Sequence, residues 1–142
     1  VPLFIRSRLM NTNANKKPNL LAAMECQICN AKHGWPDGDN CFYVGRSKKT
    51  FSPLGNPYQL GKDGDRQTVI QKYRRWLWQE IQQGWRSKAY EELVMIAEIY
   101  RYSTERDPVK LICWCAPLPC HAEVIVAAME WLIKTDQLPK ED

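Results

Sequence analysis

Hydrophobic residues recur at helical spacing in the middle of the chain and give its clearest pattern. Between residues 66 and 84 they fall on one face, whereas arginines and glutamines occupy most of the other positions. Asp65 precedes this run and is a good N-cap residue, and Gly84 is typical of a helix end. A helix is therefore predicted over 66–84. Its apolar face consists of Val69, Tyr73, Trp76, Leu77 and Ile81.

Further segments also carry patterns of regular structure. Short β-rich runs predict strands, and longer runs with helical period predict helices. The last of these segments is apolar nearly all round, which indicates a central helix, and Pro119 suits its first turn. The predicted elements are a strand over 42–44, a helix over 87–102, a buried strand over 109–115 and a helix over 120–134.

These elements follow one another as strand, helix, helix, strand, helix. Two strands that are joined through helices run parallel, and this arrangement is typical of α/β folds. We therefore expect a small single α/β domain over 42–134, with a few-stranded, mainly parallel sheet flanked by helices. Residues 1–20 are largely polar and predict a flexible lead-in, and residues 135–142 predict a frayed tail.

Length and charge restrict the class of protein. A chain of 142 residues is long enough for one domain with its own core. No apolar run is long enough to cross a bilayer and no signal peptide is evident, so we expect a cytoplasmic protein without a membrane partner. The net charge of +4 mildly favours an anionic partner, but the basic residues are spread out, unlike those of a dedicated nucleic-acid binder.

The six cysteines form two groups of three, and each group contains one of the two histidines. Without a secretory signal, metal binding or thiol chemistry is favoured over disulfides. In the first group, Cys26 and Cys29 have the spacing of a zinc half-site, which His33 and Cys41 would complete. Residues 21–41 are therefore interpreted as a zinc knuckle. The alternative is a loop with incidental thiols.

The second group comprises Cys113, Cys115, Cys120 and His121, and three interpretations are open. Three thiols and one imidazole suit structural zinc, although adjacent residues rarely ligate one metal ion. Alternatively, Cys120 in the first turn of a helix would be a reactive thiolate, with His121 or Arg46 as its base or anion partner. Cys113 and Cys115 are also explained as small core residues of a buried strand.

Glycines and polar residues next to the first strand predict an anion site. Gly45 allows close backbone approach, and Arg46 offers a planar fork for phosphate or carboxylate. In the loop that follows, Asn56 offers two hydrogen bonds between Gly55 and the stiffening Pro57. The alternative is a tight turn beside a surface arginine. Basic and aromatic residues also alternate over 72–78, where a packed aromatic stripe under a solvated basic face is favoured over nucleic-acid binding.

Several segments together resemble one family. They are Tyr43–Arg46, Gly55–Pro57, Gly64–Arg66 ahead of Tyr73–Trp76, and Cys113–His121. The combination is similar to the domain-of-unknown-function family 4326, found in bacteriophages and bacteria, over residues 42 to about 132. The resemblance implies a small α/β domain of phage or bacterial origin, acting in the host cytoplasm if phage-encoded, and it implies no reaction. The first 41 residues depart from the family pattern.

Two functional hypotheses follow. In the first, a pocket binds a phosphate-bearing or nucleotide-like ligand through Arg46 and Asn56, and Cys120 and His121 supply the reactive groups of a small enzyme. In the second, a zinc-stabilised, non-catalytic accessory module binds nucleic acid or a host protein. The remaining ligand-binding candidates are Tyr43, Gly45, Gly55, Pro57, Asp65 and Arg66.

Overall fold

The computed structural model describes residues 23–46, 52–116 and 118–140. Within these residues, three parallel strands form one sheet in the order β1-β3-β2, so the predicted small α/β fold is confirmed. The central strand β3 (Val109–Cys113) matches the predicted buried strand, and the edge strand β2 (Cys41–Tyr43) matches the first predicted strand. The other edge strand, β1 (Cys26–Asn30), was not predicted.

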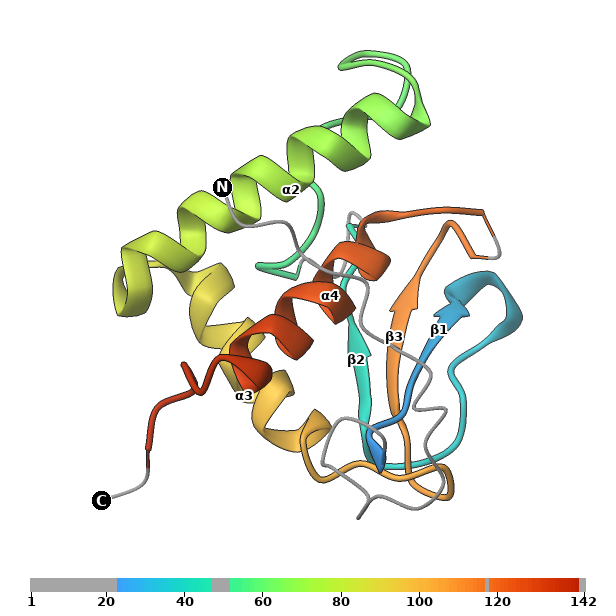
Figure 1. The fold of residues 1–142 in the computed structure, drawn as a ribbon. Helices are drawn as coiled ribbons and strands as arrows, with labels where there is room; N and C mark the ends of the chain where they lie inside the picture. Colours follow the sequence, from blue (N-terminus) through green and yellow to red (C-terminus); the bar gives the residue numbers. More distant parts are fainter. Residues whose placement is uncertain (1–22, 47–51, 117, 141–142) are drawn as a thin grey trace, which may run out of the picture.

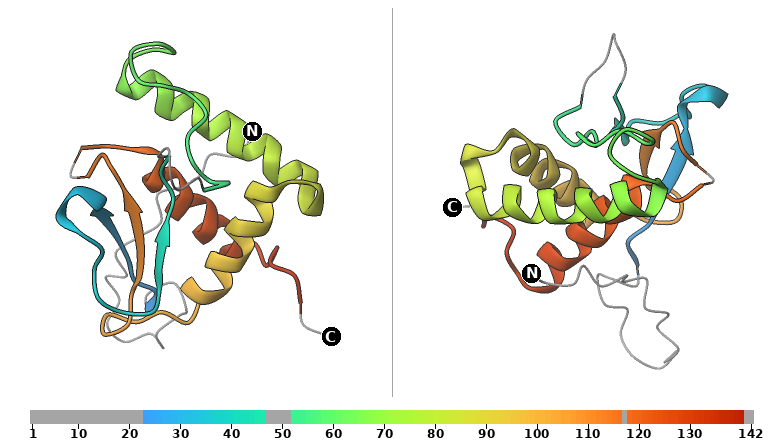
Figure 2. Two further views of the ribbon diagram at one scale, coloured as in Figure 1. Left: turned by 180° about the vertical axis from the view of Figure 1, so that it is seen from behind. Right: turned by 90° about the horizontal axis from the view of Figure 1, so that it is seen from above.

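Three helices lie to one side of the sheet (Figures 1 and 2). They are α2 (Arg66–Gln83), α3 (Lys88–Tyr100) and α4 (His121–Lys134). Two short 3-10 helices also occur: η1 (Ala31–His33) follows β1, and η2 (Gly84–Arg86) lies between α2 and α3. Each helix lies within two residues of its predicted bounds. The predicted ends of α2 are confirmed, because the Asp65 side chain accepts a hydrogen bond from the Thr68 N–H and Gly84 has a positive φ of 61°.

The hydrophobic core lies between the helices and one face of the sheet. Val109, Leu111 and Cys113 of β3 are fully buried there against the apolar faces of the helices. Aliphatic and aromatic side chains from all three helices are buried in the same core. Their removal from water is the largest contribution to the stability of the fold. Leu138, inside the predicted tail, is also buried against this core. No helix in the described ranges is long and apolar enough to cross a membrane.

The other face of the sheet is partly covered by the segment between β1 and β2. The Lys110 ammonium donates to the Asp37 carbonyl oxygen, and the Cys41 thiol donates to the carbonyl oxygens of Pro36 and Gly38, both at 3.5 Å. Tyr43 lies on this same face, because side chains alternate along a strand.

Residues 26–30 form an integral strand instead of the knuckle that the sequence suggested. Every residue of β1 is in register with β3, from Cys26 opposite Val109 to Asn30 opposite Cys113. The strand was missed because its cysteines and asparagine resemble a turn-rich metal loop more than an apolar strand. Parallel pairing on both sides of β3 compensates for this weak local preference, since β-propensity depends strongly on context.

Candidate functional site

A pocket of about 210 Å³ is lined by residues from the ends of β2 and β3 and the starts of α2 and α4. Figure 1 shows these ends and starts at one edge of the sheet. Parallel α/β sheets commonly bind ligands at this edge. Segments far apart in the sequence meet here, and seven of the predicted site residues line the pocket. These seven are Gly45, Arg46, Asn56, Arg66, Cys115, Cys120 and His121.

Two arginines from different elements line the pocket. Arg46 follows β2, and Arg66 is the first residue of α2. The Arg66 guanidinium donates to the Pro119 carbonyl oxygen at 3.1 Å, which ties the start of α2 to the connection before α4. Guanidinium groups form paired hydrogen bonds with phosphate or carboxylate, so the two arginines make the pocket suited to an anion.

Gly55 permits the close approach that places Arg46. A Cβ atom at Gly55 would lie 2.8 Å from the Arg46 Cγ atom and 3.0 Å from the Gly45 carbonyl oxygen. We expect Gly55→Ala to displace Arg46 and to lower the free energy of unfolding by about 1–3 kcal/mol through overpacking. Urea denaturation would measure this change, with Gln59→Ala, at an exposed position of the same loop, as the control. Unchanged stability would show that the loop absorbs the extra methyl group without cost.

Asn56 braces the loop that forms one wall of the pocket. Its side-chain oxygen accepts from the Tyr58 backbone N–H at 2.9 Å, and its amide nitrogen donates to the Val69 carbonyl oxygen at 3.3 Å. A second bond attaches the loop to α2, because the Tyr73 hydroxyl donates to the Leu54 carbonyl oxygen at 2.6 Å. Asn56 therefore holds the wall in place and leaves only part of its bonding capacity for a ligand.

The other ligand-binding candidates lie beside the pocket without lining it. Pro57 is exposed at the turn. The side chain and then the backbone N–H of Thr68 bond to Asp65 and lower its pKa, so this carboxylate is the N-cap of α2. Tyr43 folds over Gly45, where an added Cβ atom would lie 2.9 Å from the tyrosine oxygen.

The structure brings three thiols together beneath the pocket. The sulfur atoms of Cys113 and Cys120 are 3.5 Å apart, and the Cys120 sulfur accepts from the Ala122 N–H at 3.3 Å as the N-cap of α4. Cys113 and Cys120 are buried, whereas Cys115 is half-buried and lines the pocket. All six cysteines lie in the described ranges, and none forms a disulfide.

The three thiols differ in their tendency to ionise. Hydrogen bonding from Cys120, and then the Arg66 guanidinium, lowers the pKa of Cys115 to about 6 in spite of partial burial. Donation to Cys113 and Cys115, together with burial, raises the pKa of Cys120. Hydrogen bonding from Cys120 also lowers the pKa of Cys113 to about 6, whereas a negative charge on Cys115 opposes ionisation of Cys113. Cys113 is fully buried and Cys115 lines the pocket beside Arg66, so Cys115 is the ionisable thiol that a ligand can reach, whereas sequence reasoning had selected Cys120.

His121 connects the start of α4 to the end of β2. Its Nε2 atom bonds to the Val44 carbonyl oxygen, and its ring packs edge-on against Tyr73 with centroids 5.0 Å apart. Burial lowers the pKa of His121, so the imidazole is neutral near pH 7 and carries its proton on Nε2. This contact positions His121 in the wall of the pocket and commits one of its two nitrogens.

Aromatic and apolar residues that sequence reasoning did not select complete the pocket. Trp114 lines it and is 52% exposed, and its indole Nε1–H donates to the Tyr43 hydroxyl at 2.8 Å. The position of Trp114 between two cysteines at a strand end was the available signal. The remaining apolar wall consists of Tyr58, Leu60, Val69 and Ile70.

The first cysteine group is divided between the two faces of the sheet. Cys26 packs against the core, whereas Cys29 and Cys41 lie on the opposite face, and His33 is exposed on η1. In the ranges that the structure describes, no three histidine, cysteine, aspartate or glutamate side chains are arranged to hold a metal ion. Zinc binding by either cysteine group stays a prediction.

Comparison with known proteins identifies the family. No curated protein and no solved structure matches the chain. Residues 28–131, well over half of the chain, match the family described as Domain of unknown function (DUF4326). The match starts before residue 42, so Cys29, His33 and Cys41 lie inside the family domain and are not an addition to it, in agreement with the place of β1 in the sheet. The chain belongs to the DUF4326 family.

Proposed function

We propose that the pocket binds a phosphate-bearing, nucleotide-like ligand. The observation that carries this proposal is the presence of two arginines and an apolar, partly aromatic wall in a single pocket. Arg46 and Arg66 come from two different elements, after β2 and at the start of α2, and both guanidinium groups suit the oxygen atoms of a phosphate group.

The apolar wall supports a ligand with a planar part. Trp114 and Tyr58 offer aromatic surfaces, and Ile70 adds an aliphatic one. Each of the nucleobases can stack on an aromatic side chain, because each base has a flat π-face. The volume of about 210 Å³ is below the range typical of drug-sized ligands, so the pocket suits the phosphate group and part of the attached nucleoside, with the rest of the ligand outside it.

If the ligand is chemically changed, Cys115 is the group best placed to react. It lines the pocket beside Arg66, and its pKa of about 6 supplies a thiolate near pH 7. The predicted pair of Cys120 and His121 instead supports this site, because the Cys120 thiol donates toward Cys115 and His121 holds the end of β2.

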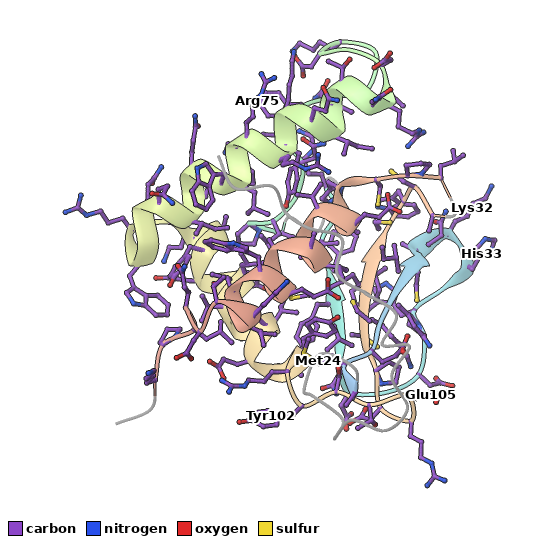
Figure 3. All side chains as sticks on the ribbon, viewed as in Figure 1. Met24, Lys32, His33, Arg75, Tyr102 and Glu105 are labelled. Atoms are coloured by element: carbon purple, nitrogen blue, oxygen red, sulfur yellow. The ribbon has the colours of Figure 1, made fainter. Side chains whose placement is uncertain are left out.

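Substitution of the two arginines tests the proposal. Isothermal titration with nucleoside mono-, di- and triphosphates and with inorganic phosphate should identify a ligand that the wild-type protein binds. We expect Arg46→Ala and Arg66→Ala each to weaken its binding about 10-fold to 100-fold, because each removes charge-assisted hydrogen bonds. Arg75→Ala is the matched control, since Arg75 is exposed on α2 outside the pocket (Figure 3). Equal affinity in all three variants would refute the proposal.

A further inference from the structure

A continuous series of aromatic side chains leads out of the pocket. Trp114 lines the pocket and donates its indole N–H to the Tyr43 hydroxyl at 2.8 Å. The Tyr43 ring lies 6.0 Å from the Trp35 ring, centroid to centroid, with an angle of 31° between the planes. Tyr43 belongs to β2, and Trp35 lies in the segment that leads from η1 to β2. We call these three residues the aromatic track.

The aromatic track is open to solvent at both ends. Trp35 is 57% exposed and Trp114 is 52% exposed, so neither indole is needed to fill the core. The hydrogen bond to Tyr43 fixes the Trp114 indole, and the Trp35 ring is held against Tyr43. Rigid aromatic surfaces of this kind, arranged in sequence, are the platforms on which single-stranded nucleic acids stack their bases.

Basic residues lie at the pocket end of the aromatic track and close in sequence to its other end. Arg46 and Arg66 line the pocket at one end, and Lys32, three residues before Trp35 in the sequence, points outward from η1 (Figure 3). Asp37 and Asp39 are exposed in the same segment as Trp35, and the Lys110 ammonium is bonded to the Asp37 carbonyl oxygen. The attraction for a phosphate backbone is therefore strongest at the pocket, and stacking dominates along the track.

We infer that the protein binds single-stranded nucleic acid, with one nucleotide in the pocket and its neighbours stacked along the aromatic track. This inference rests on the proposed function, because the pocket supplies the anchoring nucleotide. The pocket has room for at most one nucleotide unit, and Trp114 belongs to both the pocket and the track. A strand anchored at the pocket would therefore continue over Tyr43 toward Trp35. Duplex nucleic acid keeps its bases stacked inside the helix and cannot use such a surface.

Fluorescence anisotropy with labelled DNA and RNA hexanucleotides tests the inference. We expect both hexamers to bind more tightly than the corresponding mononucleotide, and a matched duplex to compete poorly. Trp35→Ala should weaken hexamer binding about tenfold while mononucleotide binding is unchanged, because Trp35 lies outside the pocket. Trp85→Ala is the control, since Trp85 is 59% exposed and lies in η2, beyond the opposite end of α2 from Arg66. A preference for one hexamer would identify DNA or RNA as the partner.

The outcomes separate this inference from the proposed function. If the mononucleotide binds but the hexamers bind no more tightly, or if Trp35→Ala binds them like the wild type, the inference is wrong and the pocket proposal stands. If the hexamers bind, Trp35→Ala weakens their binding and the two arginine substitutions have no effect, single strands stack on the aromatic track without a nucleotide anchored in the pocket, and the pocket proposal is wrong.

Discussion

Replacing Tyr73 with alanine is expected to lower the free energy of unfolding by about 3–5 kcal/mol, the range for removing a large buried ring. Tyr73 is fully buried, and its ring packs against Trp76 and His121 with centroid distances of 5.3 and 5.0 Å. It joins α2, the start of α4 and the pocket loop, so its loss leaves a cavity between three parts of the fold. Domains of this size are stable by only about 5–15 kcal/mol, so the variant should lose a large share of the free energy of unfolding.

Tyr73→Phe isolates the hydrogen bond from the packing. Burial and the neighbouring Cys120 raise the pKa of Tyr73, so its hydroxyl stays protonated and donates to the Leu54 carbonyl oxygen at 2.6 Å. Loss of this bond leaves a buried carbonyl without its partner, which should cost about 1–3 kcal/mol. Urea denaturation followed by circular dichroism would measure both variants. Tyr102→Phe, at a residue that is 70% exposed, is the control and should change stability by less than about 0.5 kcal/mol.

The two tyrosine substitutions also test how the pocket is held. Leu54 directly precedes Gly55, so release of the loop should weaken ligand binding in Tyr73→Phe although this residue does not line the pocket. A Tyr73→Phe protein with wild-type stability and wild-type binding would show that the bonds of Asn56 alone hold the loop.

Helical periodicity predicted the helices well because each helix has local signals at its ends. Asp65 and Gly84 bound α2, and the apolar residues between them recur at the helical period. The sequence of β1 contains no comparable signal, since it alternates cysteine with glutamine and asparagine around one isoleucine. Its stability comes from pairing with β3, which lies about eighty residues away in the sequence, and long-range pairing cannot be read from local patterns.

The candidate site shows the same division between local and long-range information. The sequence predicted most of the polar residues that line the pocket, because strand ends and helix starts in an α/β fold meet at one edge. It did not predict that Cys115, and not the buried Cys120, has the lowered pKa of the two thiols that line the pocket. That outcome depends on the course of the chain after β3, which buries Cys120 under the start of α4 and leaves Cys115 beside Arg66.

Alkylation of Cys115 by iodoacetamide should therefore follow a titration with a midpoint near pH 6. The alkylation rate rises with pH because the thiolate is the reactive form of cysteine. A lowered pKa therefore raises the reactive fraction of Cys115 at neutral pH. With a pKa of about 6 the thiolate fraction at pH 7 is about 90%, compared with about 1% for a thiol with a pKa near 9. The rate should fall about tenfold between pH 7 and pH 5, as the thiolate is protonated.

Mass spectrometry of the native protein after short alkylation would resolve the individual cysteines. Cys29 is an internal control, because it is also half-buried and burial raises its pKa from the ordinary value of 9.0. It should react slowly at pH 7 and faster only above pH 9.

Two substitutions test the cause of the lowered pKa of Cys115. Cys120→Ala removes the largest cause, so the midpoint of the Cys115 titration should move upward, and Arg66→Ala should move the midpoint in the same direction by less. A Cys115 rate that still rises steeply between pH 8 and 9 in the wild-type protein would mean that Cys115 is protonated at neutral pH, and the pocket would then contain no activated nucleophile at this position.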